Sequence, residues 1–260
     1  MDAMTLEEIA QRLRAAYARG PIAPLRETLD AADGSAAYEI QAINTHFWLQ
    51  QGRRIVGRKI GLTSKAVQAQ LGVDQPDYGV LFDDMLIPSG GVLPRGTVLQ
   101  PKAEAEVALV LGRDLMKPDA TPQDVAAATE AAVAAIEIVD SRITDWQITF
   151  ADTVADNGSS AYFVLGSEFT PLADLDLYTC GMVLERNGSV ASLGAGAACL
   201  GHPLNAAAWL ARTLARNGIA LEEGDILLTG ALGPMVTLSP GDHIRAIVAG
   251  LGTVSFSYQA

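Results

Sequence analysis

The sequence predicts an α+β fold with a mixed β-sheet core and a small helical N-terminal region. Helical periodicity marks the first fifty residues, whereas strand signals dominate from residue 99 onward. Helices do not alternate regularly with strands, as they would in a doubly wound parallel sheet. The 260 residues, 49% of them hydrophobic, suffice to bury a substantial core. We therefore expect a globular chain with its helices and most of its strands in separate parts of the sequence.

Two helices are expected before residue 51. Thr5 followed by Glu8 is a capping-box pattern, and apolar residues recur at helical spacing until Gly20. The second helix should cover residues 36–50 and end before Gly52.

The composition changes after this region. Residues 54–61 read as a strand, and residues 72–101 are rich in Gly, Pro and Asp. We place a division near this point, with a small N-terminal α/β region at residues 1–70 and a larger domain at residues 71–260.

The larger region should hold strands, two helices and a hairpin. Thr121 as N-cap and Pro122 at the first helical position predict a helix that continues through an Ala-rich segment to about Ala134. Asn187-Gly188 between alternating segments predicts a hairpin. The other expected elements are strands at 99–111, 135–139, 225–229 and 243–248 and a helix at 203–217, and the hairpin should span 182–193.

Charge and composition exclude several classes of function. The net charge of −12 repels nucleic-acid phosphates and anionic lipid surfaces, so we expect neither a nucleic-acid nor a membrane partner. The acidic N-terminus is no signal peptide, and no run of about 18 apolar residues could span a membrane. Cys180 and Cys199 lack CxxC spacing and are expected as buried thiols. The predicted location is the cytoplasm.

Carboxylates at three positions are candidates for a metal site. Glu104 and Glu106 lie two residues apart in a predicted strand and therefore point the same way. Glu137 lies in an apolar stretch, where a charge is costly unless it is paired or binds a metal. Together they would form an all-oxygen site suited to Mg²⁺ or Mn²⁺. From spacing alone, a solvated strand face and a buried salt bridge remain open. Zinc is disfavoured because His46, His202 and His243 lie far apart in the sequence.

Further polar residues have both a structural and a functional interpretation. Lys59 precedes Gly61, and its pattern favours a surface lysine over a lysine facing a cleft. Asp77 lies in a predicted turn, where aspartates usually bond their own backbone. Residues 152–160 could form a plain loop or a set of carboxylate-binding donors. The chain has no GxSxG motif and no complete dinucleotide fingerprint, so neither a serine hydrolase nor a nucleotide site is supported.

Taken together, these segments resemble the 2-keto-4-pentenoate hydratase (2-hydroxypentadienoate hydratase) family, within the larger fumarylacetoacetate-hydrolase-like group. The similarity extends in order over nearly the whole chain. The matching segments are VGRKIGLT from Val56, LGVDQPDYGVLF from Leu71, QPKAEAEVALVL from Gln100, IEIVDSRITDW from Ile136, DTVADNGSS from Asp152, CLGHPLNAAAWLA from Cys199 and GDILLTGALGPMV from Gly224.

The resemblance implies a β-roll core of the fumarylacetoacetate-hydrolase C-terminal type, in a homo-oligomer. It also implies Mg²⁺ or Mn²⁺ bound by Glu104, Glu106 and Glu137. Lys59 and Asp77 would then be catalytic residues that hold the substrate and move protons. Ser160 would bind the substrate carboxylate.

The implied activity is a lyase reaction in aromatic meta-cleavage catabolism. A metal-dependent hydratase would convert 2-hydroxypenta-2,4-dienoate, a small anion, to 4-hydroxy-2-oxopentanoate. The late segment TGALGPM at 229–235 favours this activity over the alternative, 4-oxalocrotonate decarboxylation at the same site. A pathway aldolase or decarboxylase is an expected partner, and a non-catalytic scaffold for that enzyme is the remaining alternative. Candidate pocket walls are Leu81, Phe82, Ile143 and Trp146.

Overall fold

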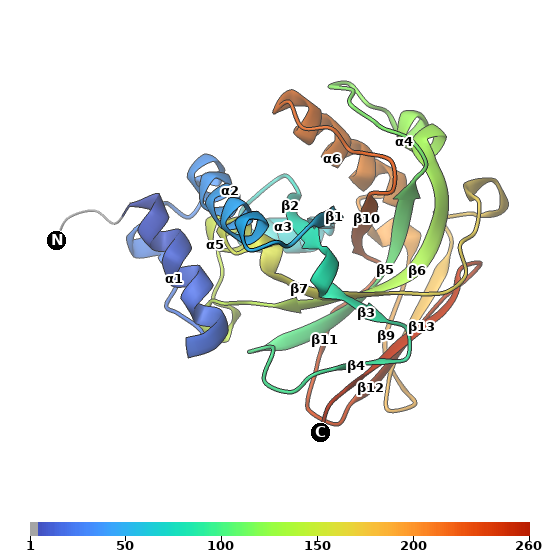
Figure 1. Ribbon diagram of the computed structural model, residues 1–260. Coiled ribbons are helices and arrows are strands. Elements are labelled where there is room, and N and C mark those ends of the chain that lie inside the picture. The colour runs from blue at the N-terminus through green and yellow to red at the C-terminus, as the bar shows by residue number, and fades with distance from the viewer. Residues whose placement is uncertain (1–4) are drawn as a thin grey trace.

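The computed structural model describes residues 5–260 and confirms the α+β class. The N-terminal helices lie beside a large mixed sheet, and a second sheet packs below it (Figure 1). The helices are α1 Leu6–Arg19, α2 Gly34–Gln50, α3 Lys65–Leu71, α4 Pro122–Ala128, α5 Phe150–Ala155 and α6 Pro203–Arg216. The strands are β1 Ile55–Gly61, β2 Asp77–Phe82, β3 Leu86–Pro88, β4 Gly91–Leu93, β5 Pro101–Leu111, β6 Thr129–Asp140, β7 Ser160–Leu165, β8 Gly181–Arg186, β9 Ser189–Ala195, β10 Ile226–Ala231, β11 Val236–Thr237, β12 His243–Val248 and β13 Gly252–Tyr258.

Local sequence signals explain the ends of several elements. Thr5 and Glu8 form the predicted reciprocal capping box at the start of α1. Asn187 and Gly188 both have positive φ, 55° and 77°, and connect β8 to β9 in the predicted hairpin. Gly218, with φ of 74°, follows the end of α6. These caps and turns depend only on neighbouring residues, which is why the sequence predicted them.

Helices α1 and α2 pack on α5 and form one apolar cluster. It includes Ile9 and Leu13 from α1, Ile40 from α2, and Phe150 and Val154 from α5. In Figure 1 these helices gather at one end of the large sheet. They therefore cover the segment that follows β6, where several of the candidate site residues lie.

The large sheet has the order β2-β1-β10-β5-β6-β7-β3, with β11 paired to β5. β1 pairs antiparallel with β2 and parallel with β10. Residues 55–61 therefore contribute an inner strand to the sheet that also holds the carboxylates. The division at residue 70 stays a prediction, and β1, from its N-terminal side, lies within this sheet.

The predicted helix through the Ala-rich segment was wrong. α4 ends at Ala128, and residues 129–140 form β6, which pairs with β5 along its length. Ala132 and Ala134 face one apolar cluster, while Ala135 faces another, so the strand is buried on both faces. Pairing with β5 and burial on both faces override the helix propensity of alanine.

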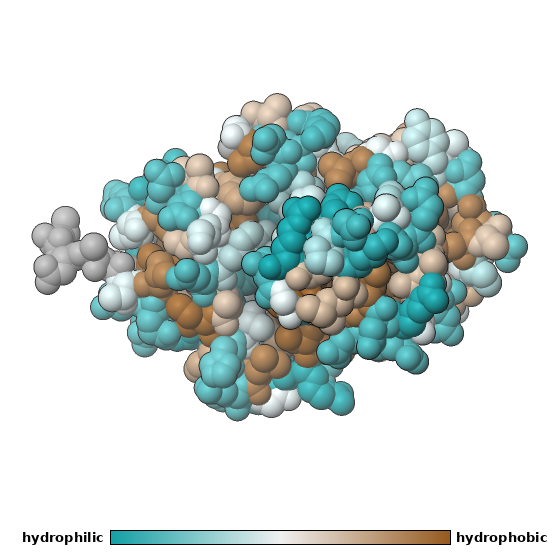
Figure 2. Space-filling model, turned by 90° about the horizontal axis from the view of Figure 1, so that it is seen from above, coloured by the Kyte–Doolittle hydropathy of each residue, from teal (hydrophilic) through white to brown (hydrophobic). Residues whose placement is uncertain are grey.

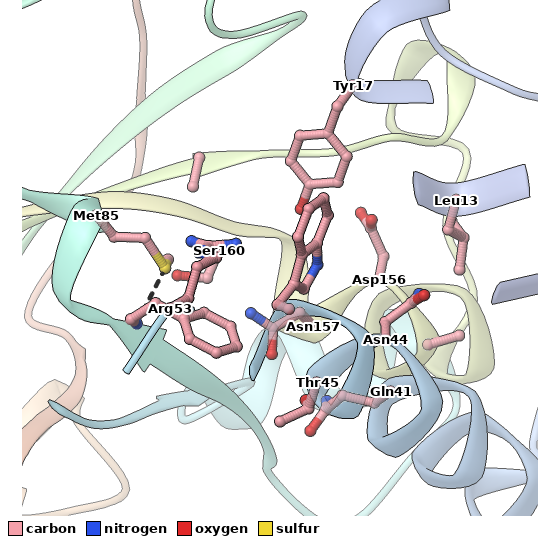
Figure 3. A pocket seen from close by; sticks show the side chains of 14 residues that line it. Leu13, Tyr17, Gln41, Asn44, Thr45, Arg53, Met85, Asp156, Asn157 and Ser160 are labelled. Carbon is pink, nitrogen blue, oxygen red and sulfur yellow. Dashed lines mark hydrogen bonds between the residues drawn. The ribbon is translucent and has the colours of Figure 1, made fainter. Parts of the chain in front are cut away.

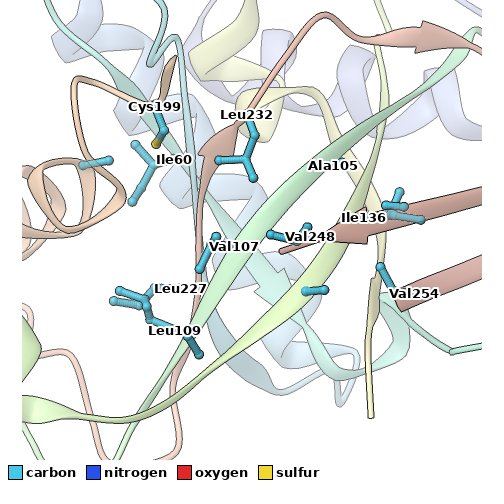
Figure 4. Packing of buried hydrophobic residues seen from close by; sticks show 14 of the residues in the cluster. Ile60, Ala105, Val107, Leu109, Ile136, Cys199, Leu227, Leu232, Val248 and Val254 are labelled. Carbon is cyan, nitrogen blue, oxygen red and sulfur yellow. The ribbon is translucent and has the colours of Figure 1, made fainter. Parts of the chain in front are cut away.

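The second sheet has the order β4-β13-β12-β8-β9 and packs across the first. Figure 4 shows the core between them, where Val107 and Leu109 of β5 and Ile136 of β6 meet Val248 and Val254. Alternate residues of β5 therefore point into this core, and the residues between them point to the opposite face. Glu104 and Glu106 belong to that opposite face.

The cysteines agree with the prediction drawn from the sequence. Figure 2 shows hydrophilic residues interspersed with smaller apolar groups over one face. Cys180 and Cys199 are buried and unpaired, as predicted. Among residues 5–260, no helix is both long and apolar enough to cross a membrane.

Candidate active site

The structure brings together the three carboxylates that the sequence singled out. Glu104 of β5 lies directly opposite Glu137 of β6, and Glu106 follows on the same face of β5. Each of the three side chains offers one oxygen, and these oxygens lie within 4.8 Å of one another. The register of two neighbouring strands thus builds a cluster from residues that are 33 positions apart in the sequence.

Burial makes it costly for all three carboxylates of this cluster to be ionised without a compensating positive charge. Burial and the neighbouring Glu137 raise the pKa of Glu104 to about 7. Burial also raises the pKa of Glu106 well above its usual value. Gly230 N donates a hydrogen bond of 2.7 Å to Glu106 Oε2, but Glu106 Oε1 has no donor among the described residues. The cluster needs either protons or a cation.

Lys59 lies on β1 and reaches the cluster from one side. Its side chain is only 4% exposed, and Nζ lies 3.3 Å from Glu137 Oε2. Burial by itself would lower the pKa of Lys59, but Glu137 and Asp77 together raise it, so the side chain stays an ammonium. The surface position favoured by the sequence pattern was wrong. One lysine charge cannot balance three carboxylates.

A strained turn holds Lys59 in place. Asn157, Gly158 and Ser159 all have positive φ, between 52° and 60°. The Gly158 carbonyl accepts a 2.9 Å hydrogen bond from Lys59 Nζ. The Asn157 side chain bonds both backbone groups of Val80, at 2.7 and 2.9 Å. We refer to residues 157–159 as the left-handed turn.

The left-handed turn is anchored from behind by a buried ion pair. Arg142 Nε donates to Asp156 Oδ1 at 2.6 Å, and its Nη2 donates to the Asp156 carbonyl at 2.7 Å. Asp156 also accepts a hydrogen bond from Ser159 Oγ. Figure 3 shows Asp156, Asn157 and Ser160 around a small cavity of about 50 Å³ on this side. Residues 152–160 are therefore the end of α5 and a fixed turn, not a plain loop.

Asp77 is the first residue of β2, where a turn was expected. It pairs with Gly61 and is 1% exposed. A Cβ at position 61 would collide with Asp77 Oδ1, so this approach requires glycine. Burial raises the pKa of Asp77, while Lys59 opposes that rise. A buried carboxyl with a raised pKa beside an ammonium is suited to proton transfer.

Two adjoining cavities open onto these groups. One, of about 380 Å³, is lined by Lys59, Asp77 and Glu104 among others. The second, of about 450 Å³, also reaches Glu104 but has more apolar walls, to which Ile60, Ala198 and Pro234 contribute. Leu62 and Met235 line both cavities. The structure therefore places a polar chamber and a more apolar chamber next to each other, and Glu104 lines both.

The cavities only partly match the predicted walls. Trp146 lines the polar chamber. Phe82 lines the small cavity of Figure 3 instead, and Leu81 and Ile143 are fully buried in apolar clusters. Leu81 and Phe82 lie at the opposite end of β2 from Asp77 and belong to one apolar cluster, so proximity in sequence to Asp77 did not place them in the chamber.

Ser160 lies beside Glu137, outside the lining of the two chambers. It is the first residue of β7, is 1% exposed and lowers the pKa of Glu137. Among the described residues that line the two chambers, Ser159 is present and Ser160 is not. Ser160 thus lies next to a carboxylate of the cluster, and its predicted contact with substrate stays a prediction.

Sequence reasoning assigned no role to two residues around this site, Arg142 and Lys102. Arg142 pairs with Asp156 behind the left-handed turn, and Lys102 lines the polar chamber. Asp156 and Asn157 lie in the segment 152–160 that was singled out, but their support of the turn was not predicted. Lys102 was detectable in principle, because it has the same strand parity as Glu104. Arg142 pairs with Asp156 across the α5 segment, and the Asn157 side chain bonds the backbone of the distant Val80, contacts that no local pattern reveals.

Comparison with known proteins gives consistent matches. The fumarylacetoacetate (FAA) hydrolase C-terminal family model matches residues 54–257. The 2-keto-4-pentenoate hydratase 2 of Dechloromonas aromatica (strain RCB) is 56% identical over 253 residues, which are 97% of each chain. The 2-keto-4-pentenoate hydratase of Burkholderia vietnamiensis (strain G4 / LMG 22486) is 54% identical, covering 99% of this chain and 98% of the relative. Among solved structures, a 4-oxalocrotonate decarboxylase from Pseudomonas putida G7, complexed with magnesium and adipate, superposes with a TM-score of 0.93 at 36% identity, covering 98% of both chains.

Proposed function

The chain belongs to the fumarylacetoacetate hydrolase family, and we propose that it is a hydratase that converts 2-hydroxypenta-2,4-dienoate to 4-hydroxy-2-oxopentanoate. Full-length relatives with that named activity share more than half of their residues with it. One observation of the structure supports the proposal most directly: Lys59, Asp77 and Glu104, a member of the carboxylate cluster, line a single chamber. An ammonium can bind an anionic substrate, and a carboxyl with a raised pKa can carry out the two proton transfers.

The carboxylate cluster fits a divalent metal, and we propose Mg²⁺ or Mn²⁺ as the ion. Glu104, Glu106 and Glu137 supply oxygen ligands only, which hard cations prefer. Glu106 Oε1 is buried without a donor, as expected of an oxygen kept for a metal. The decarboxylase with the same fold is complexed with magnesium in one structure and with calcium in another. Glu104, Glu106 and Glu137 would hold the ion, which would supply Lewis-acid polarisation of the substrate.

The residues of the chain would then carry the proton transfers. Asp77, a carboxyl whose pKa is raised by burial, gives a proton to C5 of the dienol and leaves a 2-oxo-3-enoate. The proton of the 2-hydroxyl leaves to solvent in this step. Water then adds at C4 of this intermediate, and Asp77 takes up a proton from the water, which leaves an enolate. A proton from solvent adds to C3 of the enolate, which gives 4-hydroxy-2-oxopentanoate and leaves Asp77 protonated for the next turnover. Lys59 stays charged beside Glu137 and stabilises the negative charge that spreads over the substrate. The turn carbonyl of Gly158 keeps its ammonium in position.

A parallel assay tests this function against its alternative. The expected result is loss of 2-hydroxypenta-2,4-dienoate absorbance with metal present, without CO₂ release from 4-oxalocrotonate. Exhaustive chelation should abolish the reaction, and Mg²⁺ or Mn²⁺ should restore it. The decarboxylase alternative is retained because the solved decarboxylase shares the fold over 98% of this chain. CO₂ release without loss of the dienoate would favour it.

The scaffold alternative and the assembly have separate tests. Zero turnover of both substrates with metal present would favour a non-catalytic partner of the pathway aldolase or decarboxylase. We propose that the protein is cytoplasmic and forms a homo-oligomer. Light scattering after size-exclusion chromatography would measure the mass of the assembly. Co-purification with the pathway aldolase or decarboxylase would test the proposed contact between the two enzymes.

A further inference from the structure

A second lysine lines the polar chamber and has no part in the mechanism above. Lys102 lies on β5 two residues before Glu104, so the two side chains leave the same face of the strand. Its Nζ lies 4.2 Å from the centroid of the Trp146 ring. Lys102 is therefore next to the carboxylate cluster, with its charge held over an aromatic face.

The Trp146 ring that lies under Lys102 is held by hydrogen bonds. Trp146 Nε1 donates a 3.0 Å hydrogen bond to the carbonyl of Gln100, and the Gln100 side chain accepts from Asp145 N at 2.8 Å. The Gln100 amide also donates to the carbonyls of Ser141 and Ile143. Gln100 thus connects the segment around Trp146 to the start of β5 by hydrogen bonds. Because Lys102 follows two residues after Gln100, these bonds fix the position of the ring relative to the lysine.

The two lysines of the chamber differ in what they bind. Lys59 Nζ is engaged by Glu137 and by the Gly158 carbonyl. Lys102 Nζ has no hydrogen-bond acceptor among the described residues, and its side chain is half-buried. Lys59 and Lys102 are the only cations among the described residues lining the two chambers. The positive group still available to a ligand is Lys102.

Charge balance gives this lysine a function. Glu104, Glu106 and Glu137 bring three formal negative charges, which a divalent ion and Lys59 balance, while Asp77 holds the proton that it gives to the substrate. The carboxylate of an anionic substrate then adds one negative charge that none of these groups offsets. Lys102 supplies the matching positive charge, and its ammonium is free to donate to a carboxylate.

We propose that Lys102, held over Trp146, binds the C1 carboxylate of the substrate. The inference rests on the proposed function, since it takes a 2-oxo or 2-hydroxy acid as the ligand. It explains why a chamber lined by so many carboxylates accepts an anion. The aromatic face holds the ammonium near the cluster before the substrate arrives, so less side-chain freedom is lost on binding.

The test measures binding of 2-oxopentanoate, which has no diene to hydrate, to metal-loaded protein by calorimetry. Lys102→Met should raise its Kd about tenfold or more, the loss expected for a charge-assisted hydrogen bond. Lys102→Arg should recover most of the affinity. In turnover, Lys102→Met should raise KM for the dienoate about tenfold and change kcat by less than about threefold. Lys117→Met is the matched control, because Lys117 pairs with Asp124 on the surface.

The outcomes separate this inference from the proposed function. A Lys102→Met protein that binds metal normally and keeps the wild-type Kd for 2-oxopentanoate within twofold overturns the role of Lys102 alone. A wild-type protein that neither binds 2-oxopentanoate nor consumes the dienoate overturns the proposed function, and this inference with it. An equal loss in Lys102→Met and Lys117→Met would assign the effect to overall charge and would also overturn the inference.

Discussion

Lys59 Nζ lies 3.3 Å from Glu137 Oε2, and both side chains are buried. This pair joins β1 to β6, strands that are not neighbours in the large sheet. A buried pair of this kind is maintained only when the remaining charges are also satisfied. Glu104 and Glu106 leave an excess of negative charge beside it, and that excess is the physical reason for expecting a cation.

Replacing Asp77 by Asn should separate proton transfer from binding. We expect kcat to fall by roughly 10²- to 10⁴-fold, the usual contribution of a general acid or base. Metal affinity, measured by calorimetry, should stay within about threefold, because Asp77 is not one of the three clustered glutamates. Asp84→Asn, an exposed change, is the control. Wild-type rates of both ketonisation and hydration in Asp77→Asn would remove Asp77 from the mechanism.

Replacing Glu106 by Gln should weaken metal binding. The change keeps the size of the side chain but removes one charged oxygen ligand, and even outer partners of metal ligands contribute about 10- to 100-fold in affinity. We expect a loss of about 100-fold or more for Mg²⁺ or Mn²⁺ in calorimetry. Glu223→Gln, at an exposed position, should bind as wild type. Full metal affinity in Glu106→Gln would argue against this site.

Asn157→Gly tests whether the left-handed turn positions Lys59. Glycine tolerates the positive φ, so the change mainly removes the two hydrogen bonds to Val80. We expect a loss of about 1–3 kcal/mol in the free energy of unfolding, measured with urea, and a lower kcat. Asn187→Gly is the matched control, since Asn187 also has positive φ but lies in the β8–β9 hairpin. Equal kcat in the two variants would leave the turn with a purely structural role.

Metal binding should depend on pH around neutrality. In the metal-free protein the pKa of Glu104 is raised to about 7, so this carboxyl binds a proton below that pH. A cation needs the carboxylate, so its affinity should rise as the pH increases from 6 to 8, with release of protons. Calorimetry in buffers of different ionisation enthalpy measures that release. Affinity that is constant from pH 6 to 8, with no proton release, would contradict the raised pKa.

The same raised pKa has the opposite effect on the stability of the metal-free fold. Glu104 has a higher pKa in the folded chain than its unfolded value of 4.5, so the folded state binds more protons between pH 4.5 and about 7. The contribution of Glu104 to stability is therefore full below pH 4.5 and decreases as the pH rises through 7. Added metal should reverse this loss, because it binds only the folded cluster. Thermal unfolding with and without Mg²⁺ measures the difference.

Predictions from sequence held where neighbouring residues determine the structure. The capping box of Thr5 and Glu8 and the Asn187-Gly188 turn involve contacts only a few positions long. The Ala-rich segment failed because its structure depends on β5, 20 to 30 residues away in the chain. The pattern around Lys59 failed for the same reason, since its burial comes from β6 and the left-handed turn.

The sequence by itself determined the α+β class, the family resemblance and the identity of the three glutamates. Alternation along a strand is a local property, so Glu104 and Glu106 could be placed on one face without any knowledge of the fold. Only the tertiary structure decided that Glu137 lies opposite Glu104, that Lys59 is buried beside both and that Lys102 lies over Trp146. Those relationships depend on strand register and on packing between distant segments, which arise only when the whole chain folds.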